Sequence, residues 1–243
     1  MPISFDPTNV LQALQQGDLS VQGQFLRGSN YTFLAQLIYQ GETYPVVYKP
    51  TQGEQPLWDF PTGTLAKREV IAYSISEALG WHLVPPTVYR LSGPLGPGSL
   101  QQYIEHDPNY HYFNFAEDER QRLRPVMLFD ALVNNADRKG SHILVDAHDN
   151  LWLIDHGLCF HEEDKLRTVI WDFAGETIPL DLLEDVRRLI PRLVPDGDLA
   201  QQLKGTLNGA EIRALATRAK LLVERGCFPY PARDRRSTPW PPV

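Results

Sequence analysis

Residues 130–160 read DALVNNADRKGSHILVDAHDNLWLIDHGLCF, and the pattern inside this stretch decides which fold the whole chain is expected to adopt. Two short apolar runs, residues 143–145 and 151–154, flank a polar turn, which predicts a β-hairpin. One polar cluster precedes the first strand and another follows the second. A hairpin brings both clusters to the same end. The side chains predicted to converge there are Asp137, His142 and Asp155.

The types of these three side chains indicate a functional site. Two carboxylates and an imidazole in one small site suit a divalent cation and an acceptor hydroxyl better than they suit an apolar core. Each of the three residues taken alone has a simpler interpretation, as a polar residue at a hairpin end. The combination is what predicts a functional site.

The composition is that of a globular protein. With 243 residues, of which 42% are hydrophobic and 22% charged, the chain is long enough for a buried core in one domain or in two lobes. The net charge of −7 argues against sequence-independent binding of nucleic acid, which requires a basic face. No nucleic-acid partner is expected.

Three features predict a cytoplasmic protein. No apolar run is long enough to span a bilayer, so no membrane segment is expected. The first residues, MPISFDPTNVLQALQQGD, lack the basic and then apolar order of a signal peptide. Cys159 and Cys227 form neither a disulfide framework nor a metal-ligand spacing, which agrees with a reducing compartment.

The first half of the chain reads mainly as strands. Residues 20–24, 31–37 and 43–49 predict three strands in a meander. The loop between the first two contains Gly28, Ser29 and Asn30. It is either an ordinary hairpin turn or a loop whose backbone amides cover a phosphate, although the full G-x-G-x-x-G pattern is missing.

Lys49 ends the third of these strands, where a lone lysine is usually a solvated charge. Residues 63–80 then predict a helix, because apolar residues recur at helical spacing and Gly80 is a suitable C-terminal stop. Glu69 lies in the second turn of this helix. Two further strands are expected at residues 84–91 and 99–104.

The motifs around the hairpin resemble those of a known superfamily. Asp137-Arg138, then His142 five residues after Asp137, then Asp155-His156-Gly157 resemble the catalytic loop and the metal loop of protein-kinase-like proteins. The closer likeness is to the atypical branch that includes phosphatidylinositol 3-/4-kinases and HipA-type kinases. Two residues depart from the usual pattern: His142 stands where most kinases have Asn, and His156 where they have Phe.

The resemblance implies an α+β, two-lobed fold, with an antiparallel-sheet N-lobe over residues 1–106 and a reduced helical C-lobe over residues 107–243. It also implies ATP and Mg²⁺, with Mn²⁺ as an alternative ion, and a hydroxyl-bearing acceptor of unknown class. Lys49 would hold the inner phosphates, with Glu69 as its partner, and Asp137 would position the acceptor. His142 and Asp155 would hold the metal.

The resemblance also implies two nucleotide contacts in the first lobe. The loop at Gly28, Ser29 and Asn30 would cover the phosphates. The backbone of Gln102, Tyr103 and Ile104, between the lobes, would meet the adenine ring.

The second half of the chain predicts helices at residues 117–133, 180–193 and 209–225, only two of them after the metal loop. Asp172 is expected either to cap a helix or turn or to brace the catalytic loop. The proline-rich residues 229–243 predict an irregular segment that wraps the surface or is loose.

Three alternatives stay open on the sequence. Transfer of AMP from a nucleotide bound in reverse would use nearly the same residues as phosphoryl transfer. A regulatory nucleotide-binding module with little turnover would account for the two histidine departures. A metal-dependent hydrolase would use His142, Asp155, His156 and His161, although neighbours such as Asp155 and His156 tend to point to opposite faces.

Overall fold

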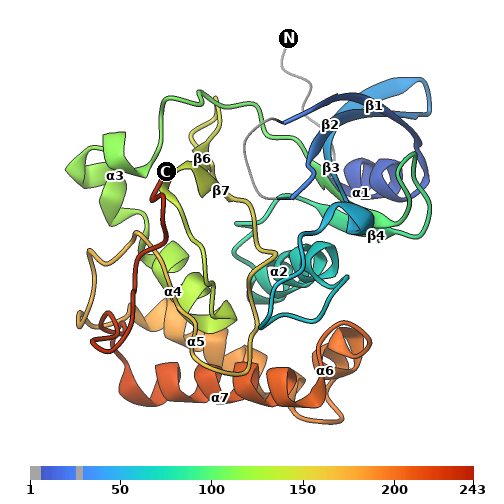
Figure 1. Ribbon diagram of the computed structural model, residues 1–243. Coiled ribbons are helices and arrows are strands. Elements are labelled where there is room, and N and C mark those ends of the chain that lie inside the picture. The colour runs from blue at the N-terminus through green and yellow to red at the C-terminus, as the bar shows by residue number, and fades with distance from the viewer. Residues whose placement is uncertain (1–6, 26–29) are drawn as a thin grey trace.

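The computed structural model describes residues 7–25 and 30–243 and combines an antiparallel sheet with a mainly helical part (Figure 1). The sheet order is β1-β2-β3-β5-β4, with antiparallel pairing throughout. Its strands are β1 (Asp18–Gln24), β2 (Phe33–Tyr39), β3 (Glu42–Pro50), β4 (Thr87–Arg90) and β5 (Gly98–Gln102). All five match strands expected from the sequence, with shifted ends.

The two faces of the sheet pack against different helices. Alternate residues of β3, namely Tyr44, Val46 and Tyr48, are buried beneath helix α1 (Pro7–Gln16). Since successive side chains of a strand point to opposite faces, Lys49 lies on the other face, toward helix α2 (Leu65–Leu79). Figure 1 shows α2 between the sheet and the helical part. The alternation in β3 thus aims Lys49 at the junction of the two parts.

Helix α2 is held by both parts of the molecule. It ends at Gly80, which adopts the left-handed conformation expected of a C-cap (φ 73°). Its residues Ile71 and Ile75 belong to the large apolar core, together with residues of the helical part. Arg68 is buried and pairs with Glu211, 2.5 Å away. The position of α2 relative to the helical part is therefore fixed by both apolar packing and a buried ion pair.

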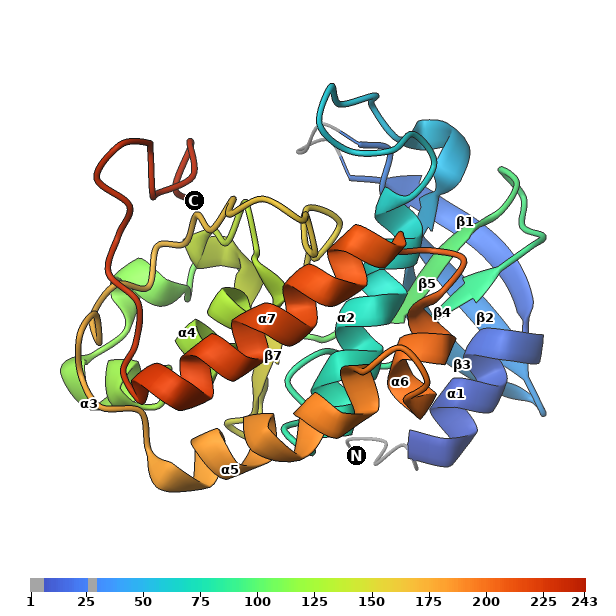
Figure 2. The same cartoon turned by 90° about the horizontal axis from the view of Figure 1, so that it is seen from below.

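The helical part contains more elements than the sequence predicts. Beyond α2 the helices are α3 (Glu117–Gln121), α4 (Arg124–Val133), α5 (Leu180–Leu189), α6 (Asp198–Leu203) and α7 (Gly209–Arg225). Short 3₁₀ turns are η1 (Thr51–Gly53), η2 (Tyr112–Asn114), η3 (Gly140–His142) and η4 (Ile190–Leu193). Figure 2 shows α5 and α7 along one side of this part.

Three expectations about the helices were wrong. The helix predicted at residues 117–133 is broken into α3 and α4, with Pro125 at the start of α4, where its missing N–H is tolerated. The helix predicted at residues 180–193 becomes the 3₁₀ turn η4 at Pro191. Three helices, not two, follow the metal loop, because the six-residue α6 is too short to show a periodic pattern.

The predicted hairpin is present as β6 (Ile143–Val145) and β7 (Leu151–Leu153). The Asp146 side chain closes its turn by accepting hydrogen bonds from the backbone of His148 and Asn150. Leu153 donates its backbone N–H to the Leu83 carbonyl, 2.7 Å away, just beyond α2. The hairpin is thus attached to the segment after α2. None of the helices in the described ranges has the length and apolar character needed to cross a membrane.

Candidate active site

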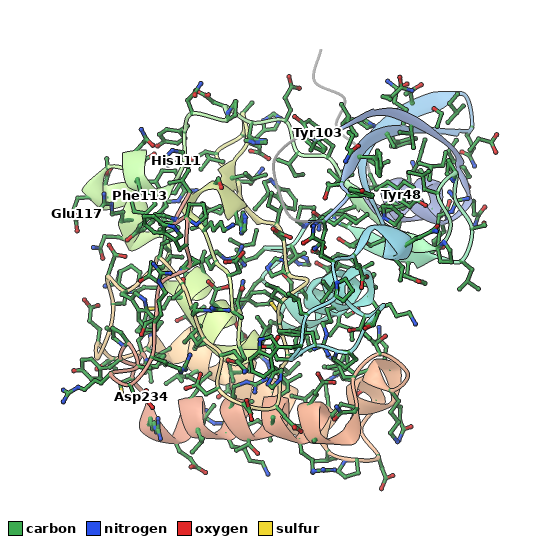
Figure 3. The ribbon with its side chains drawn as sticks, viewed as in Figure 1. Tyr48, Tyr103, His111, Phe113, Glu117 and Asp234 are labelled. Atoms are coloured by element: carbon green, nitrogen blue, oxygen red, sulfur yellow. The ribbon has the colours of Figure 1, made fainter. Side chains whose placement is uncertain are left out.

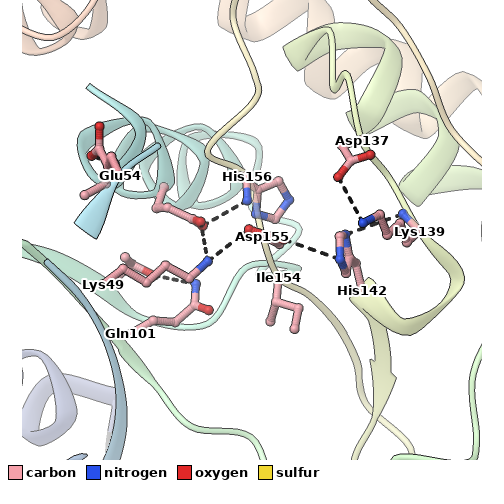
Figure 4. A network of polar contacts seen from close by, with 12 residues as sticks. Lys49, Glu54, Gln101, Asp137, Lys139, His142, Ile154, Asp155 and His156 are labelled. Carbon is pink, nitrogen blue, oxygen red and sulfur yellow. Dashed lines mark hydrogen bonds and ion pairs between the residues drawn. The ribbon is translucent and has the colours of Figure 1, made fainter. Parts of the chain in front are cut away.

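Lys49 is the centre of a cluster of charges at the junction (Figure 4). Its Nζ lies 2.5 Å from Glu69 Oε1 and 3.1 Å from Asp155 Oδ1. Burial alone would lower the pKa of Lys49, but the negative charges of Asp155 and Glu69 outweigh it and raise this pKa above its ordinary value. Lys49 is therefore a permanent cation between two carboxylates that come from different parts of the chain.

Glu69 links the sheet to the loop after the hairpin. Its side chain is 3% exposed, and the second carboxylate oxygen, Oε2, accepts the backbone N–H of His156 at 2.9 Å. Both oxygens are used, so the carboxylate is held in one orientation. The pair between Lys49 and Glu69 that the sequence analysis expected is present, while the phosphate-binding role of Lys49 stays a prediction.

Asp155 follows β7 in an unusual conformation. Its φ is 62°, in the left-handed region that side chains other than glycine rarely adopt, and such strain is found where a side chain must be aimed precisely into a site. One carboxylate oxygen faces Lys49 and the other lies 3.4 Å from His142 Nε2. The charge of Lys49 holds the pKa of Asp155 well below its usual range. The side chain is half-exposed, so an ionised oxygen is accessible from solvent.

His142 is an uncharged imidazole at neutral pH. Burial lowers its pKa to about 4, against the opposing attraction of Asp155. The backbone N–H of Lys139 points at His142 Nδ1, at 3.4 Å, which favours the tautomer with its proton on Nε2, facing Asp155. To bind a metal through Nε2, the ring would have to move this proton to Nδ1 and give up the Lys139 contact.

Asp137 lies at the opposite end of the same short loop (Figure 4). Its backbone N–H donates to Asn135 Oδ1 at 2.9 Å, and its carboxylate is 3.4 Å from Lys139 Nζ. Burial raises the pKa of Asp137, and the nearby Lys139 opposes that shift. The hairpin therefore gathers Asp137, His142 and Asp155 at one end as the sequence predicts. Lys139 is an addition that the sequence analysis did not single out.

Arg138 is the structural centre of the two loops. Its side chain is fully buried and its Nε donates to both oxygens of the buried Asp130, each at 3.1 Å. Nη1 donates to the carbonyls of His142 (3.2 Å) and Ile154 (2.8 Å), and Nη2 lies 2.7 Å from His156 Nε2. One guanidinium thus fixes α4, the loop before the hairpin and the loop after it.

The sequence contained a signal for this arrangement. Asp130 follows Val126 by four residues and Met127 by three, which places a carboxylate on the apolar side of the predicted helix. A charged residue in that position needs a buried partner. Arg138, within the quoted motif, is that partner.

The hydrolase alternative is not supported by the side-chain positions. His156 is fully buried against Arg138, with its ring perpendicular to that of Phe129. His161 packs on the Phe60 ring and accepts the backbone N–H of Glu163 at 3.0 Å. Within residues 7–25 and 30–243, no three His, Cys, Asp or Glu side chains are grouped so that they could hold a metal ion. The Asp155 side chain is half-exposed and the His156 side chain is buried, as expected of residues adjacent in an extended chain.

The phosphate-covering loop lies mostly outside the described residues. Gly28 and Ser29 belong to the undescribed positions. Asn30 is described, and its Oδ1 accepts the backbone N–H of Gln55 at 2.8 Å, which ties it to the loop after β3. Its predicted contact with a nucleotide stays a prediction.

The segment predicted to meet adenine has a distinctive backbone. The N–H of Gln102 donates to the Pro86 carbonyl (2.9 Å), and that of Tyr103 donates to the Pro45 carbonyl (3.1 Å). In an antiparallel pair the opposite residue normally returns an N–H, but a proline has none. The carbonyls of Gln102 and Tyr103 are therefore left as acceptors, whereas their N–H groups are already used.

The space beside this segment is small, and its predicted contact with adenine stays a prediction. Tyr103 lies where the chain leaves the sheet (Figure 3). A cavity of about 20 Å³ between α1 and this segment has room for a water molecule but not for a purine. The carbonyl of Ile104 accepts from His106 Nδ1 at 2.8 Å. That cavity therefore cannot hold a base, and the Ile104 carbonyl is already used.

Asp172 does not brace the catalytic loop directly. Its Oδ2 accepts the hydroxyl of Tyr112 at 2.7 Å, and Arg120 lies 4.0 Å from its other oxygen. Tyr112 and Phe113 pack where a side chain on Gly140 would project. Asp172 therefore supports the loop only through the aromatic residues that cover it.

The donor set can be compared with what a divalent ion requires. Magnesium in nucleotide-binding proteins is commonly held by one or two protein oxygens together with phosphate oxygens and water. The half-exposed, ionised Asp155 fits that requirement, and His142 offers a nitrogen that suits manganese better than magnesium. A bound ion would neutralise phosphate charge beside Lys49.

Known proteins resemble the chain in sequence and in fold. No protein-family model matches it. Protein Rv2133c of Mycobacterium tuberculosis is 40% identical over 263 residues, covering 94% of this chain and 93% of that protein. The crystal structure of the Helicobacter pylori proinflammatory kinase CtkA matches with a TM-score of 0.53 and 13% identity, covering 88% of this chain and 94% of that one.

The two matches support different conclusions, one about the fold and one about the family. At 13% identity the likeness to CtkA shows the fold, and it confirms the predicted α+β, two-lobed, kinase-like architecture. The predicted boundary between residues 106 and 107 stays a prediction. The identity with Rv2133c extends over nearly the full length of both proteins, and the chain therefore belongs to the same family as protein Rv2133c of Mycobacterium tuberculosis.

Proposed function

We propose that the chain is an ATP-dependent phosphotransferase of the atypical kinase-like type that acts on a hydroxyl-bearing acceptor. The observation that carries this proposal is the position of Lys49 Nζ between Glu69 (2.5 Å) and Asp155 (3.1 Å). Glu69 orients the lysine, and Asp155 is half-exposed beside it, so that phosphate oxygens and a divalent ion can be bound together at this point.

The other residues take their roles from their places around this pair. Asp137 would accept the proton of the acceptor hydroxyl as the acceptor oxygen bonds to the γ-phosphorus. The bond between that phosphorus and the β–γ bridging oxygen would break, and ADP would leave. Lys139, 3.4 Å from Asp137, would face the charge of the transferred group. The carbonyls of Gln102 and Tyr103 would accept hydrogen bonds from the base.

Incubation with ATP labelled separately at the γ and α phosphates tests this proposal. The assay is run with magnesium and with manganese and offers three acceptors: small polyols, phosphoinositide-containing vesicles and the protein itself. Release of ADP with γ label on an acceptor supports phosphoryl transfer. Label from the α phosphate would establish nucleotidyl transfer instead. Absence of both products with every acceptor contradicts an enzymatic role.

A second candidate is a regulatory module that binds nucleotide with little turnover. The observation in its favour is the His142 ring, whose Nδ1 faces the Lys139 N–H and whose Nε2 faces Asp155. That tautomer is a poor metal ligand. Substituting His142→Asn provides an oxygen ligand at the same place. Nucleotide binding without turnover in both the wild type and this variant would favour the regulatory module.

A further inference from the structure

The last residues of the chain return to the loop that carries Asp137. α7 ends at Arg225 and is capped by Gly226; beyond it, Phe228 is fully buried and packs against Phe173. Figure 1 shows the terminal segment rising from the end of α7 to finish beside β6. We call residues 230–243 the C-terminal strap.

The strap is held by hydrogen bonds to its backbone. The Ser237 carbonyl accepts the backbone N–H of Thr168 (3.0 Å) and the indole N–H of Trp171 (3.2 Å). The Pro242 carbonyl accepts the backbone N–H of Gly140 at 2.8 Å. Gly140 lies between Asp137 and His142, so the strap ends on the loop that connects the two candidate site residues.

Side chains add to this attachment. Arg235 pairs with Asp164 (2.6 Å) and donates to the Leu166 carbonyl (3.2 Å). Pro239 is buried. The two exposed arginines of the strap do not share this contact. Arg236 lies over the Trp240 ring, and Arg233 has no hydrogen bond or ion pair with any described residue.

The proline content of the strap explains why it can stay docked. Prolines reduce the conformational freedom of the undocked segment, so less entropy is lost on docking. Proline also keeps its carbonyl but has no N–H, which makes the strap mainly an acceptor of hydrogen bonds. Gly140 and Thr168 supply the matching donors. A terminal segment is usually frayed unless it is tied down in this way.

We propose that the C-terminal strap is a positioning element for the transfer site: its Pro242 and Ser237 carbonyls hold the Gly140 loop and the segment at Thr168, so that Asp137 and His142 keep their places. The proposal rests on the proposed function. Its own claim is that docking of a segment remote in sequence determines the transfer rate while leaving nucleotide affinity unchanged. Small displacements of a catalytic group are sufficient to reduce a rate strongly.

The test uses the full-length chain with a loosened strap, Arg235→Ala/Pro239→Gly/Pro242→Gly, which keeps every carbonyl. The matched control is Pro231→Gly/Arg233→Ala, which changes the same residue types in the same segment without touching these contacts. Hydrogen exchange is measured by NMR at the amides of Gly140 and Thr168. The amides of Arg138 and Val169 are internal references, because their acceptors, Arg167 and Arg138, lie outside the strap. The single variant Arg235→Ala serves if the triple variant does not fold.

Loosening should accelerate exchange at Gly140 and Thr168 by about tenfold or more, with the two reference amides within about twofold of the wild type. The transfer rate should fall roughly ten- to a hundredfold, while affinity for ATP with magnesium changes by less than about twofold. The control should match the wild type in all of these measurements.

Unchanged protection at Gly140 would overturn the proposal, and so would a transfer rate that stays the same or rises once protection is lost. Failure of the proposed function has a different signature: the wild type itself then transfers no label, and the positioning role fails with it. An active wild type with an equally active loosened variant removes the strap proposal alone.

Discussion

Arg138 offers the sharpest test of how the site is built. Replacing it by methionine keeps an unbranched apolar side chain, shorter than that of arginine, and removes every donor. The fully buried Asp130 would keep only Asn135 Nδ2 (3.0 Å) and the Thr168 hydroxyl (3.2 Å), and the Ile154 carbonyl would lose its 2.8 Å donor. Removing one partner of a buried ion pair costs about 3–5 kcal/mol, and each orphaned buried acceptor about 1–3 kcal/mol. Arg138→Met should therefore lower the free energy of unfolding by about 4 kcal/mol or more.

Urea denaturation monitored by tryptophan fluorescence measures this loss. That amount approaches the total stability of a typical domain, about 5–15 kcal/mol, so the variant is expected to be partly unfolded without denaturant. Arg187→Met is the control, since the pair between Arg187 and Glu184 is exposed on α5 and should contribute less than about 1 kcal/mol. The double variant Asp130→Asn/Arg138→Met removes the unpaired charge and should recover part of the loss. A loss below about 2 kcal/mol in Arg138→Met would refute the reasoning.

The remaining predictions concern the residues around Lys49. Asp137→Asn should lower the transfer rate by roughly two to four powers of ten and leave ATP affinity nearly intact; an equal fall in affinity, measured by calorimetry, would contradict its assignment to the acceptor. Asp155→Asn should weaken magnesium-dependent nucleotide binding, and a Kd independent of this change would remove Asp155 from the metal. Burial lowers the pKa of His142 to about 4 and that of His156 well below its ordinary value. Below a pH of about 6.5, these two histidines therefore bind more protons in the unfolded chain than in the folded one. Stability should therefore fall as the pH drops through about 6.5 toward 4, and His142→Asn should reduce that fall in urea titrations at several pH values. A slope that this variant leaves unchanged would contradict the buried, neutral state of His142.

Local patterns were sufficient to predict the arrangement of the site loops. Short apolar runs and turn residues placed β6 and β7. A hairpin brings Asp137, His142 and Asp155 to one end whatever the exact length of its strands. Helical spacing and Gly80 placed Glu69 on α2, whereas its pairing with Lys49 came from the resemblance to kinase-like proteins. These features depend on residues close in sequence, which is why periodicity alone identified them.

The contacts that hold the site depend on residues distant in sequence. Fully buried arginines are rare, so Arg68 reads as a surface charge until its partner Glu211, 143 residues further along the chain, is known. The strap was expected either to wrap the surface or to be loose, because composition gives no indication of which N–H groups a proline-rich segment will meet. Its return to Gly140 follows from the path of α7 and could not be predicted from the sequence.

Calorimetric titration with ATP tests the central claim most directly, because it asks whether the charges around Lys49 form a nucleotide site. It is performed with and without magnesium on the wild type, on Lys49→Ala, and on the control Lys220→Ala, which changes an exposed lysine of α7. The wild type and the control should bind ATP in a magnesium-dependent manner. Lys49→Ala should bind at least about tenfold more weakly, since a hydrogen bond to a charged group contributes about 1.5–3 kcal/mol. Equal affinity in Lys49→Ala and the wild type would contradict the account.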